Sequence, residues 1–201
     1  MKDFKIRASA CGKIMGIKGL GKTGQSYCQE WLKEQIYGRK KKFGNKYTEK
    51  GLVMEDDSID FIAEHLGYGM LLKNEEYFEN DYCTGTPDII LPDHLIDVKN
   101  SYDCFTFPMW YVAVPNKDYY WQAQVYMWML MDTPEHLIEK EFQYNNDMEL
   151  DYDEFREDYL YNHIKPKYRI KSFDIKRNDS DIELIKERVE ECRKYIKTLL
   201  K

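Results

Sequence analysis

An α/β fold of the mixed α+β kind is predicted for this chain, with a central mixed β-sheet flanked by helices. Two observations predict it. Segments with helical periodicity stand toward both ends of the chain, and a block of short strand-like segments with turn residues lies between them. The length of 201 residues suits one domain with a sizeable core and is short for two, so we expect a single domain over residues 1–201.

Helical segments stand on both sides of the strand block. The segment 25–38 ends at Gly38, the residue type that most often ends a helix. The segment 47–66 and the last twenty residues carry apolar residues at helical spacing. In chain order we expect helices within 25–66, strands within 70–100, helices at 105–113 and 118–131, a strand at 136–144, an irregular acidic segment at 145–165, and a strand and a helix within 168–200.

The composition excludes several classes of protein. Acidic residues outnumber basic ones, 36 to 30, and the formal charge of −6 speaks against a wholly basic nucleic-acid binder. No apolar run reaches the roughly 18 residues of a membrane span, and the start lacks the apolar segment of a secretory signal. Five cysteines without a CxxC pair indicate reduced thiols. We therefore expect a soluble cytoplasmic protein without a membrane partner.

One glycine-rich segment, from Gly16 to Thr23, fits the phosphate-loop pattern GxxxxGK[ST]. A phosphate loop follows a buried apolar strand and opens a helix. The residues before Gly16 are small and polar, so the sequence lacks that strand. A nucleotide-binding phosphotransferase that uses this segment is therefore a remote alternative.

The most informative segment is a predicted β-hairpin. Two apolar runs surround the turn Leu-Pro-Asp-His at 91–94, with Pro in a turn position. If Ile90 pairs with Leu95, the register of the whole hairpin follows, and the residues just before and after the paired runs face each other.

In this register two acids and one lysine converge. Asp88 lies opposite Asp97, with Cβ atoms about 4.5–5.5 Å apart, and alternation puts Lys99 on the same face as Asp97. Opposed like charges destabilise a sheet unless a positive group lies between them. Carboxylate oxygens in this arrangement suit Mg²⁺ or Mn²⁺. The alternative is a surface salt bridge between Asp97 and Lys99, with Asp88 as a turn residue.

The flanking helices carry further candidates. Glu55 stands four residues after Gly51, on the apolar stripe of the helix at 47–66, where an unpaired carboxylate would be costly. Gln122 and Gln124 lie on the helix at 118–131, about 200° apart, so only one of them can face a given site. The alternatives are an ordinary surface acid for Glu55 and solvent-edge amides for the glutamines.

Taken in order, Glu55, Pro87-Asp88, Asp97-Val98-Lys99 and the Gln-x-Gln helix resemble the PD-(D/E)XK nuclease superfamily. Within it, the chain resembles the lambda exonuclease branch, also called YqaJ-like viral recombinases. The resemblance covers roughly residues 5–131 and implies a restriction-endonuclease-like core.

The resemblance implies a two-metal site. Asp88 would bridge two divalent ions, and Asp97 with the Val98 carbonyl would complete the shell of one of them. Glu55 would bind the second ion directly or through water. Two Mg²⁺ ions are expected, with Mn²⁺ as the alternative.

Other roles also follow from the resemblance. Lys99 would orient and deprotonate the attacking water and neutralise charge on the transition state. Gln124 would position Lys99 or the water, with Gln122 as the less favoured alternative.

Three residues are expected near the substrate phosphate. Ser9 matches a serine of the branch that contacts phosphate, and Thr86 occupies the place of a second small hydroxyl. The usual arginine upstream of the serine has no clear counterpart, although Arg7 could replace it.

The resemblance further implies a 5′→3′ exonuclease that acts on the ends of double-stranded DNA. Enzymes of this branch often form a trimeric ring and work with a single-strand annealing protein in phage-type recombination. A phage-encoded chain would act in the host cytoplasm. The alternatives are an endonuclease with the same metal site and a DNA-binding module without catalysis.

The basic residues gather in two regions that could follow DNA phosphates despite the negative net charge. For the second region, a solvated surface is the favoured interpretation. The first region holds Lys13, Lys18, Lys22, residues 39–42, Lys46 and Lys50, and the second holds Lys165, Lys167, Arg169 and Lys171.

Overall fold

The computed structural model describes residues 2–41, 46–131, 141–147, 161 and 163–201. Helices and two small sheets make up this part of the chain. In chain order they are β1 (Ile6–Arg7), the 3₁₀ helix η1 (Ala8–Ile14), α1 (Lys22–Tyr37), α2 (Lys46–Leu66), β2 (Phe78–Glu79), β3 (Cys83–Gly85), β4 (Ile89–Ile90), β5 (His94–Asn100), α3 (Lys117–Met131), β6 (Glu141–Asp147), the 3₁₀ helix η4 (Pro166–Tyr168), β7 (Ile170–Ile175) and α4 (Asp179–Leu199).

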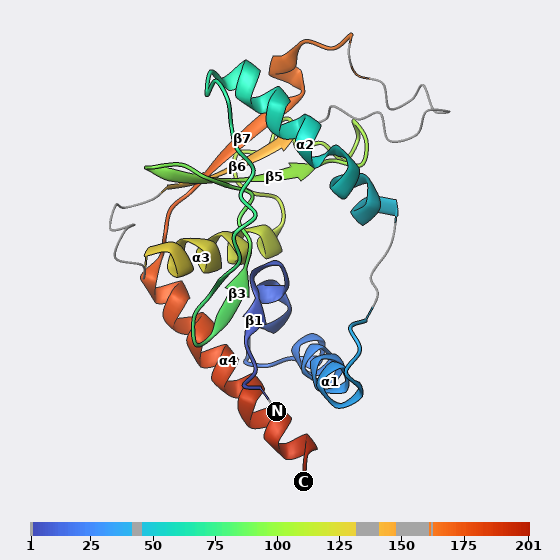
Figure 1. Cartoon of the computed structure of the whole chain (residues 1–201), viewed down its shortest axis with the longest axis vertical. Helices are drawn as coiled ribbons and strands as arrows, with labels where there is room; N and C mark the ends of the chain where they lie inside the picture. The colour runs from blue at the N-terminus through green and yellow to red at the C-terminus, as the bar shows by residue number, and fades with distance from the viewer. Residues whose placement is uncertain (1, 42–45, 132–140, 148–160, 162) are drawn as a thin grey trace.

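The larger sheet confirms the predicted mixed α/β class. Its strand order is β4-β5-β6-β7, with β5 and β6 parallel and the outer pairs antiparallel. Figure 1 shows this sheet between α2 on one side and α3 on the other. A smaller sheet, in the order β1-β3-β2, lies on the α3 side beside α4.

The β4–β5 hairpin has the predicted register. Ile90 pairs with Leu95, and the Leu91 N–H donates to the His94 carbonyl at 2.9 Å, which closes the turn. Because alternation in a strand is fixed, this register decides which side chains point to α2 and which to α3.

Alternation along β5 divides its residues between two cores. Ile96 and Val98 pack in an apolar cluster with residues of α2, whereas Leu95 belongs to the cluster that contains α3 and α4. Asp97 and Lys99 have the parity of Leu95, so they lie on the α3 side of the sheet.

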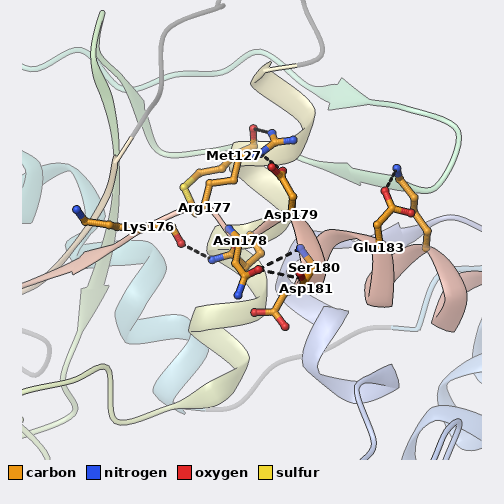
Figure 2. Close-up of polar contacts among 10 residues, drawn as sticks. Met127, Lys176, Arg177, Asn178, Asp179, Ser180, Asp181 and Glu183 are labelled. Atoms are coloured by element: carbon orange, nitrogen blue, oxygen red, sulfur yellow. Dashed lines mark hydrogen bonds and ion pairs between the residues drawn. The ribbon is translucent and has the colours of Figure 1, made fainter.

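The junction between β7 and α4 is tied to α3 (Figure 2). Asn178 is the N-cap of α4, and its side chain accepts hydrogen bonds from the N–H groups of Ser180 and Asp181. Arg177 donates from Nη1 to the Met127 carbonyl of α3 at 3.2 Å. These contacts fix the start of α4 against the middle of α3.

The phosphate-loop pattern does not have the structural context of a phosphate loop. A 3₁₀ helix, not a buried strand, precedes Gly16, and α1 begins at Lys22. The Leu20 N–H donates to the Glu191 carboxylate at 2.9 Å, and Arg188 donates to the Gly16 carbonyl at 3.2 Å. The segment is a loop clamped to α4 by an Arg–Glu pair, so the phosphotransferase alternative is not favoured.

The helix expected at 105–113 is wrong, because these residues form turns. The Asp103 carboxylate accepts the N–H groups of Phe105 and Thr106, which offers the backbone an alternative to helical hydrogen bonds. Pro108 cannot donate within a helix and disfavours helical backbone before it.

The strand expected at 136–144 corresponds to β6, which the structure places at Glu141–Asp147. The start of that prediction, at 136–140, lies outside the described residues, as does most of the segment expected to be irregular at 145–165. Among the residues that the structure describes, no helix is long and apolar enough to span a membrane.

Candidate active site

The hairpin brings the predicted acids and lysine together. Asp97 is buried, with 1% of its surface exposed, and its Oδ2 forms an ion pair with the Lys99 ammonium. Asp88 crosses the hairpin, and its Oδ2 accepts the Val98 N–H at 2.8 Å. Two carboxylates and one ammonium therefore lie together on the α3 side of the sheet.

These three charged groups shift one another's pKa values. Burial and the Asp97 carboxylate raise the pKa of Asp88 to about 7, although the Lys99 ammonium and the Val98 N–H oppose the change. Burial disfavours the charged form of Lys99, but Asp97 and Asp88 outweigh it and raise the pKa of Lys99. Lys99 therefore stays protonated, and a second cation would be needed to neutralise both acids.

Gln122 is the glutamine that faces this site. Its Nε2 donates to Asp97 Oδ1 at 3.2 Å and to the Tyr126 hydroxyl at 3.0 Å, and that hydroxyl donates to the Thr86 carbonyl at 3.0 Å. Burial and the charge of Asp97 raise the pKa of Tyr126, so the phenol keeps the proton it donates. This chain of hydrogen bonds fixes the Asp97 carboxylate from the side of α3.

The prediction that Gln124 rather than Gln122 faces the site does not agree with the contacts of Gln124. Gln124 is fully buried, and its amide accepts the Asn178 N–H and donates to the Lys176 carbonyl, both at 2.8 Å. Two residues along a helix are about 200° apart, so Gln124 faces the β7–α4 junction while Gln122 faces the acids. Gln124 holds the fold together at a distance from the site.

Tyr126 was missed as a site residue. It stands four residues after Gln122 on the same helix face, which is the signal that the sequence offered. A Cβ added at Gly85 would lie 2.7 Å from Tyr126 Cε1, so the ring packs directly on the backbone before Thr86. Gly85 is therefore required for Tyr126 to reach its partners.

Glu55 is not joined to the two acids in a single cluster. Its Oε2 lies 3.0 Å from the Lys73 ammonium, which also contacts Asp56 at 2.9 Å. Across the described part of the chain, no group of three or more His, Cys, Asp or Glu side chains is placed to hold a metal ion. The role of Glu55 as a metal ligand stays a prediction.

The residues expected near the phosphate are exposed. Ser9 lies in η1 and Thr86 follows β3, and both side chains reach solvent. A Cβ at Gly85 would lie 3.0 Å from that of Ala8, so the two segments are in contact. Arg7 is also exposed, and its Nε donates to a tyrosine hydroxyl of α1 at 3.3 Å.

The donor set fits a hard divalent cation. Asp88, Asp97 and the backbone carbonyl of Val98 offer oxygen ligands, which Mg²⁺ and Mn²⁺ prefer. The raised pKa of Asp88 marks a place where a second negative charge is costly without a cation. Such a cation would offset the repulsion between the two carboxylates.

A phage-related exonuclease from Haemophilus somnus 129PT has the same arrangement of elements. Its crystal structure superposes with a TM-score of 0.79 at 27% sequence identity, over 99% of this chain and 96% of that one. The chain therefore resembles an exonuclease of the lambda exonuclease type over nearly its whole length, as the sequence pattern predicts.

Two further structures share the fold of this chain. They are of LHK-Exo, an alkaline exonuclease from Laribacter hongkongensis, alone and in complex with dAMP. The TM-scores are 0.69 and 0.68 at 15% and 17% identity, over 96% and 97% of this chain and 88% and 91% of the others. No protein-family model and no curated protein sequence matches the chain.

Substitution by leucine should affect mainly catalysis at Gln122 and mainly stability at Gln124. Gln122→Leu removes the hydrogen bonds to Asp97 and Tyr126 and should lower the rate of DNA hydrolysis by about 10–100-fold. Gln124→Leu leaves a buried carbonyl and a buried N–H without partners and should lower the free energy of unfolding by about 1–3 kcal/mol for each group.

Hydrolysis of duplex DNA and urea unfolding of both variants measure this difference. The assignment of Gln122 to the site would be contradicted by full activity in Gln122→Leu together with strong loss of activity in a well-folded Gln124→Leu variant.

The metal-free protein should lose stability as Asp88 ionises. Its pKa is about 7 when folded and 3.8 in an unfolded chain, so the folded state binds more protons between these values and the contribution of Asp88 to stability falls as pH rises. Asp88→Asn keeps an acceptor for the Val98 N–H without the charge. In EDTA, this variant should be more stable than the unsubstituted protein at pH 8, with a smaller gain at pH 5.

Chemical denaturation at both pH values measures the difference in the free energy of unfolding. The same difference at pH 5 and pH 8 would contradict the raised pKa.

Proposed function

We propose that the chain is a metal-dependent exodeoxyribonuclease that degrades linear double-stranded DNA from a 5′ end. The observation that carries this function is the grouping of Asp88, Asp97, Lys99 and Gln122 within a fold shared almost end to end with a phage-related exonuclease. Two carboxylates beside a protonated lysine are suited to phosphodiester hydrolysis with divalent cations.

Mg²⁺ is the proposed cofactor, with Mn²⁺ as the alternative. Asp88, Asp97 and the Val98 carbonyl would hold one ion. Glu55 would bind a second ion in place of its present ion-pair partner, Lys73. When bound, the ions supply an activated water and stabilise both the attacking and the leaving oxygen.

The protein's own side chains would position the Asp97 carboxylate and neutralise the charge of the transition state. Lys99 is held protonated by its acidic neighbours, which supports a role in neutralising the charge of the transition state rather than in accepting a proton at rest. Gln122 fixes one oxygen of Asp97, so the other faces Lys99.

The exposed hydroxyls of Ser9 and Thr86, with Arg7 nearby, would bind the phosphate at the 5′ end. Their segments meet where Ala8 contacts Gly85, close to the carbonyl that Tyr126 holds. A phosphate pocket at this place would favour substrates with a free end over closed circles.

Family resemblance further supports a homo-oligomer, proposed as a trimeric ring, and a single-strand annealing protein as a partner in phage-type recombination. The endonuclease alternative is not favoured by the exonuclease neighbour, and the comparison of linear with closed circular DNA tests it directly.

Purified protein with Mg²⁺ should release nucleotides from linear duplex DNA, faster from a 5′-phosphate than from a 5′-hydroxyl end. Asp88→Ala and Lys99→Ala should each lower the rate at least about 100-fold, because each removes a charge needed at the reacting phosphate. Asp93→Ala is the matched control, since Asp93 is an exposed acid in the turn of the same hairpin; it should keep full activity.

Acid-soluble nucleotides released over time give the rates. Intact digestion in both site variants would refute the assignment of the site, and rapid cutting of closed circles would favour the endonuclease.

A further inference from the structure

A second concave site lies next to the acids, across the start of α3. It is a cavity of about 770 Å³ between β7, the loop that precedes α3 and the first residues of α4. Three lysines line it, Lys117, Lys171 and Lys176, and Tyr120 and Trp121 form part of its wall. None of these residues belongs to the catalytic group described above.

The strand register places this cavity on the same face of the sheet as the acids. Lys99 of β5 pairs with residue 146 of β6, which pairs with Lys171 of β7. Residues paired across a sheet point to the same side, and two strand spacings separate these two lysines by about 10 Å. Phe173 of β7 shares the core cluster of Leu95, which confirms the common face.

The first turn of α3 separates the two sites. The Lys99 ammonium lies 5.6 Å from the centre of the Tyr119 ring, on the catalytic side. The next two residues, Tyr120 and Trp121, line the cavity, and their rings meet edge to face at 5.3 Å. A strand of DNA that leaves the acids would therefore meet aromatic rings within one helical turn.

The residues that line the cavity could contact both the phosphate and the base of a nucleotide. Ammonium groups bind phosphates, and an exposed face of Trp or Tyr stacks on an unpaired base, worth about 1–3 kcal/mol per base. Two acids, Asp174 and Asp181, also line the cavity, and Asp181 accepts the Tyr120 hydroxyl at 2.5 Å. The three lysines outnumber these acids.

Lys176 is oriented away from the polar contacts that tie the β7–α4 junction. In Figure 2 its side chain extends from the junction while Asn178 and Arg177 make the contacts to α4 and α3. The backbone carbonyl of Lys176 accepts the hydrogen bond from Gln124, so a change of the Lys176 side chain leaves this contact in place.

We propose that this cavity binds a nucleotide unit of single-stranded DNA, one or two nucleotides from the catalytic acids. The inference rests on the proposed nuclease function and names a binding site in addition to it. The volume lies within the range of about 300–1,000 Å³ of small-ligand sites, which admits a nucleotide but not a duplex. A base can stack on Trp121 only when it is unpaired, so the occupant is a single strand or a released mononucleotide.

Binding of a fluorescent oligo-dT to the protein in EDTA, followed by anisotropy, tests the lysines. The triple variant Lys117→Glu, Lys171→Glu and Lys176→Glu should bind at least tenfold more weakly than the unsubstituted protein. The matched control carries Lys194→Glu, Lys197→Glu and Lys201→Glu, an equal change of charge in the last turns of α4 and just after it, remote from the larger sheet (Figure 1); it should bind within about twofold. Equal weakening in both triples would overturn the proposal.

Trp121 provides a second readout that does not depend on the triple variant. Oligo-dT should quench tryptophan fluorescence in the unsubstituted protein, and Trp121→Phe should lose most of that quenching while keeping its thermal unfolding temperature. Unchanged quenching in Trp121→Phe would overturn the stacking. The same titration with dTMP distinguishes the sources: quenching by dTMP at equal concentration supports a site for released nucleotide, and quenching by the oligonucleotide alone supports a strand.

The two proposals fail separately. A protein that binds oligo-dT through these lysines but digests no DNA would contradict only the nuclease function. Digestion of linear DNA, together with oligo-dT binding that is unchanged in the triple lysine variant and in Trp121→Phe, would contradict only this site.

Discussion

The repulsion between the buried Asp97 carboxylate and the half-buried Asp88 carboxylate is the constraint around which the structure is arranged. Asp88 and Asp97 face each other across a hairpin, and Lys99 neutralises only one of the two charges. The Val98 N–H and the Gln122 amide each hold one of the carboxylates. These contacts hold two like charges close together, which lowers the stability of the metal-free fold. Such an arrangement is typical of a site at which a divalent cation would offset the repulsion.

Helix α3 connects this site to the rest of the fold. One face presents Gln122 and Tyr126 to the acids, and the opposite face uses Gln124 to bind the start of α4. The same helix therefore positions the carboxylate of the site and attaches the site to α4. Its first turn also divides the acids from the lysine-lined cavity beside Trp121, so one element organises both.

The sequence predicted local features well and non-local ones poorly. The register of Ile90 with Leu95 followed from alternation and a short turn, and the convergence of Asp97 and Lys99 followed from the same rule. Periodicity alone could say that Gln122 and Gln124 face opposite ways, but not which faces the acids, because that depends on how α3 packs on distant β5 and β7. The pairing of Glu55 with the lysine at 73 was equally invisible, because the two are brought together only by folding.

The central claim is that the hairpin acids hold a divalent cation, and Mn²⁺ binding followed by electron paramagnetic resonance tests it without any substrate. The unsubstituted protein should bind Mn²⁺, Asp88→Asn should bind it at least tenfold more weakly, and Asp93→Asn, in the turn of the same hairpin, should bind it normally. Equal Mn²⁺ affinity in the unsubstituted protein and Asp88→Asn would contradict the account.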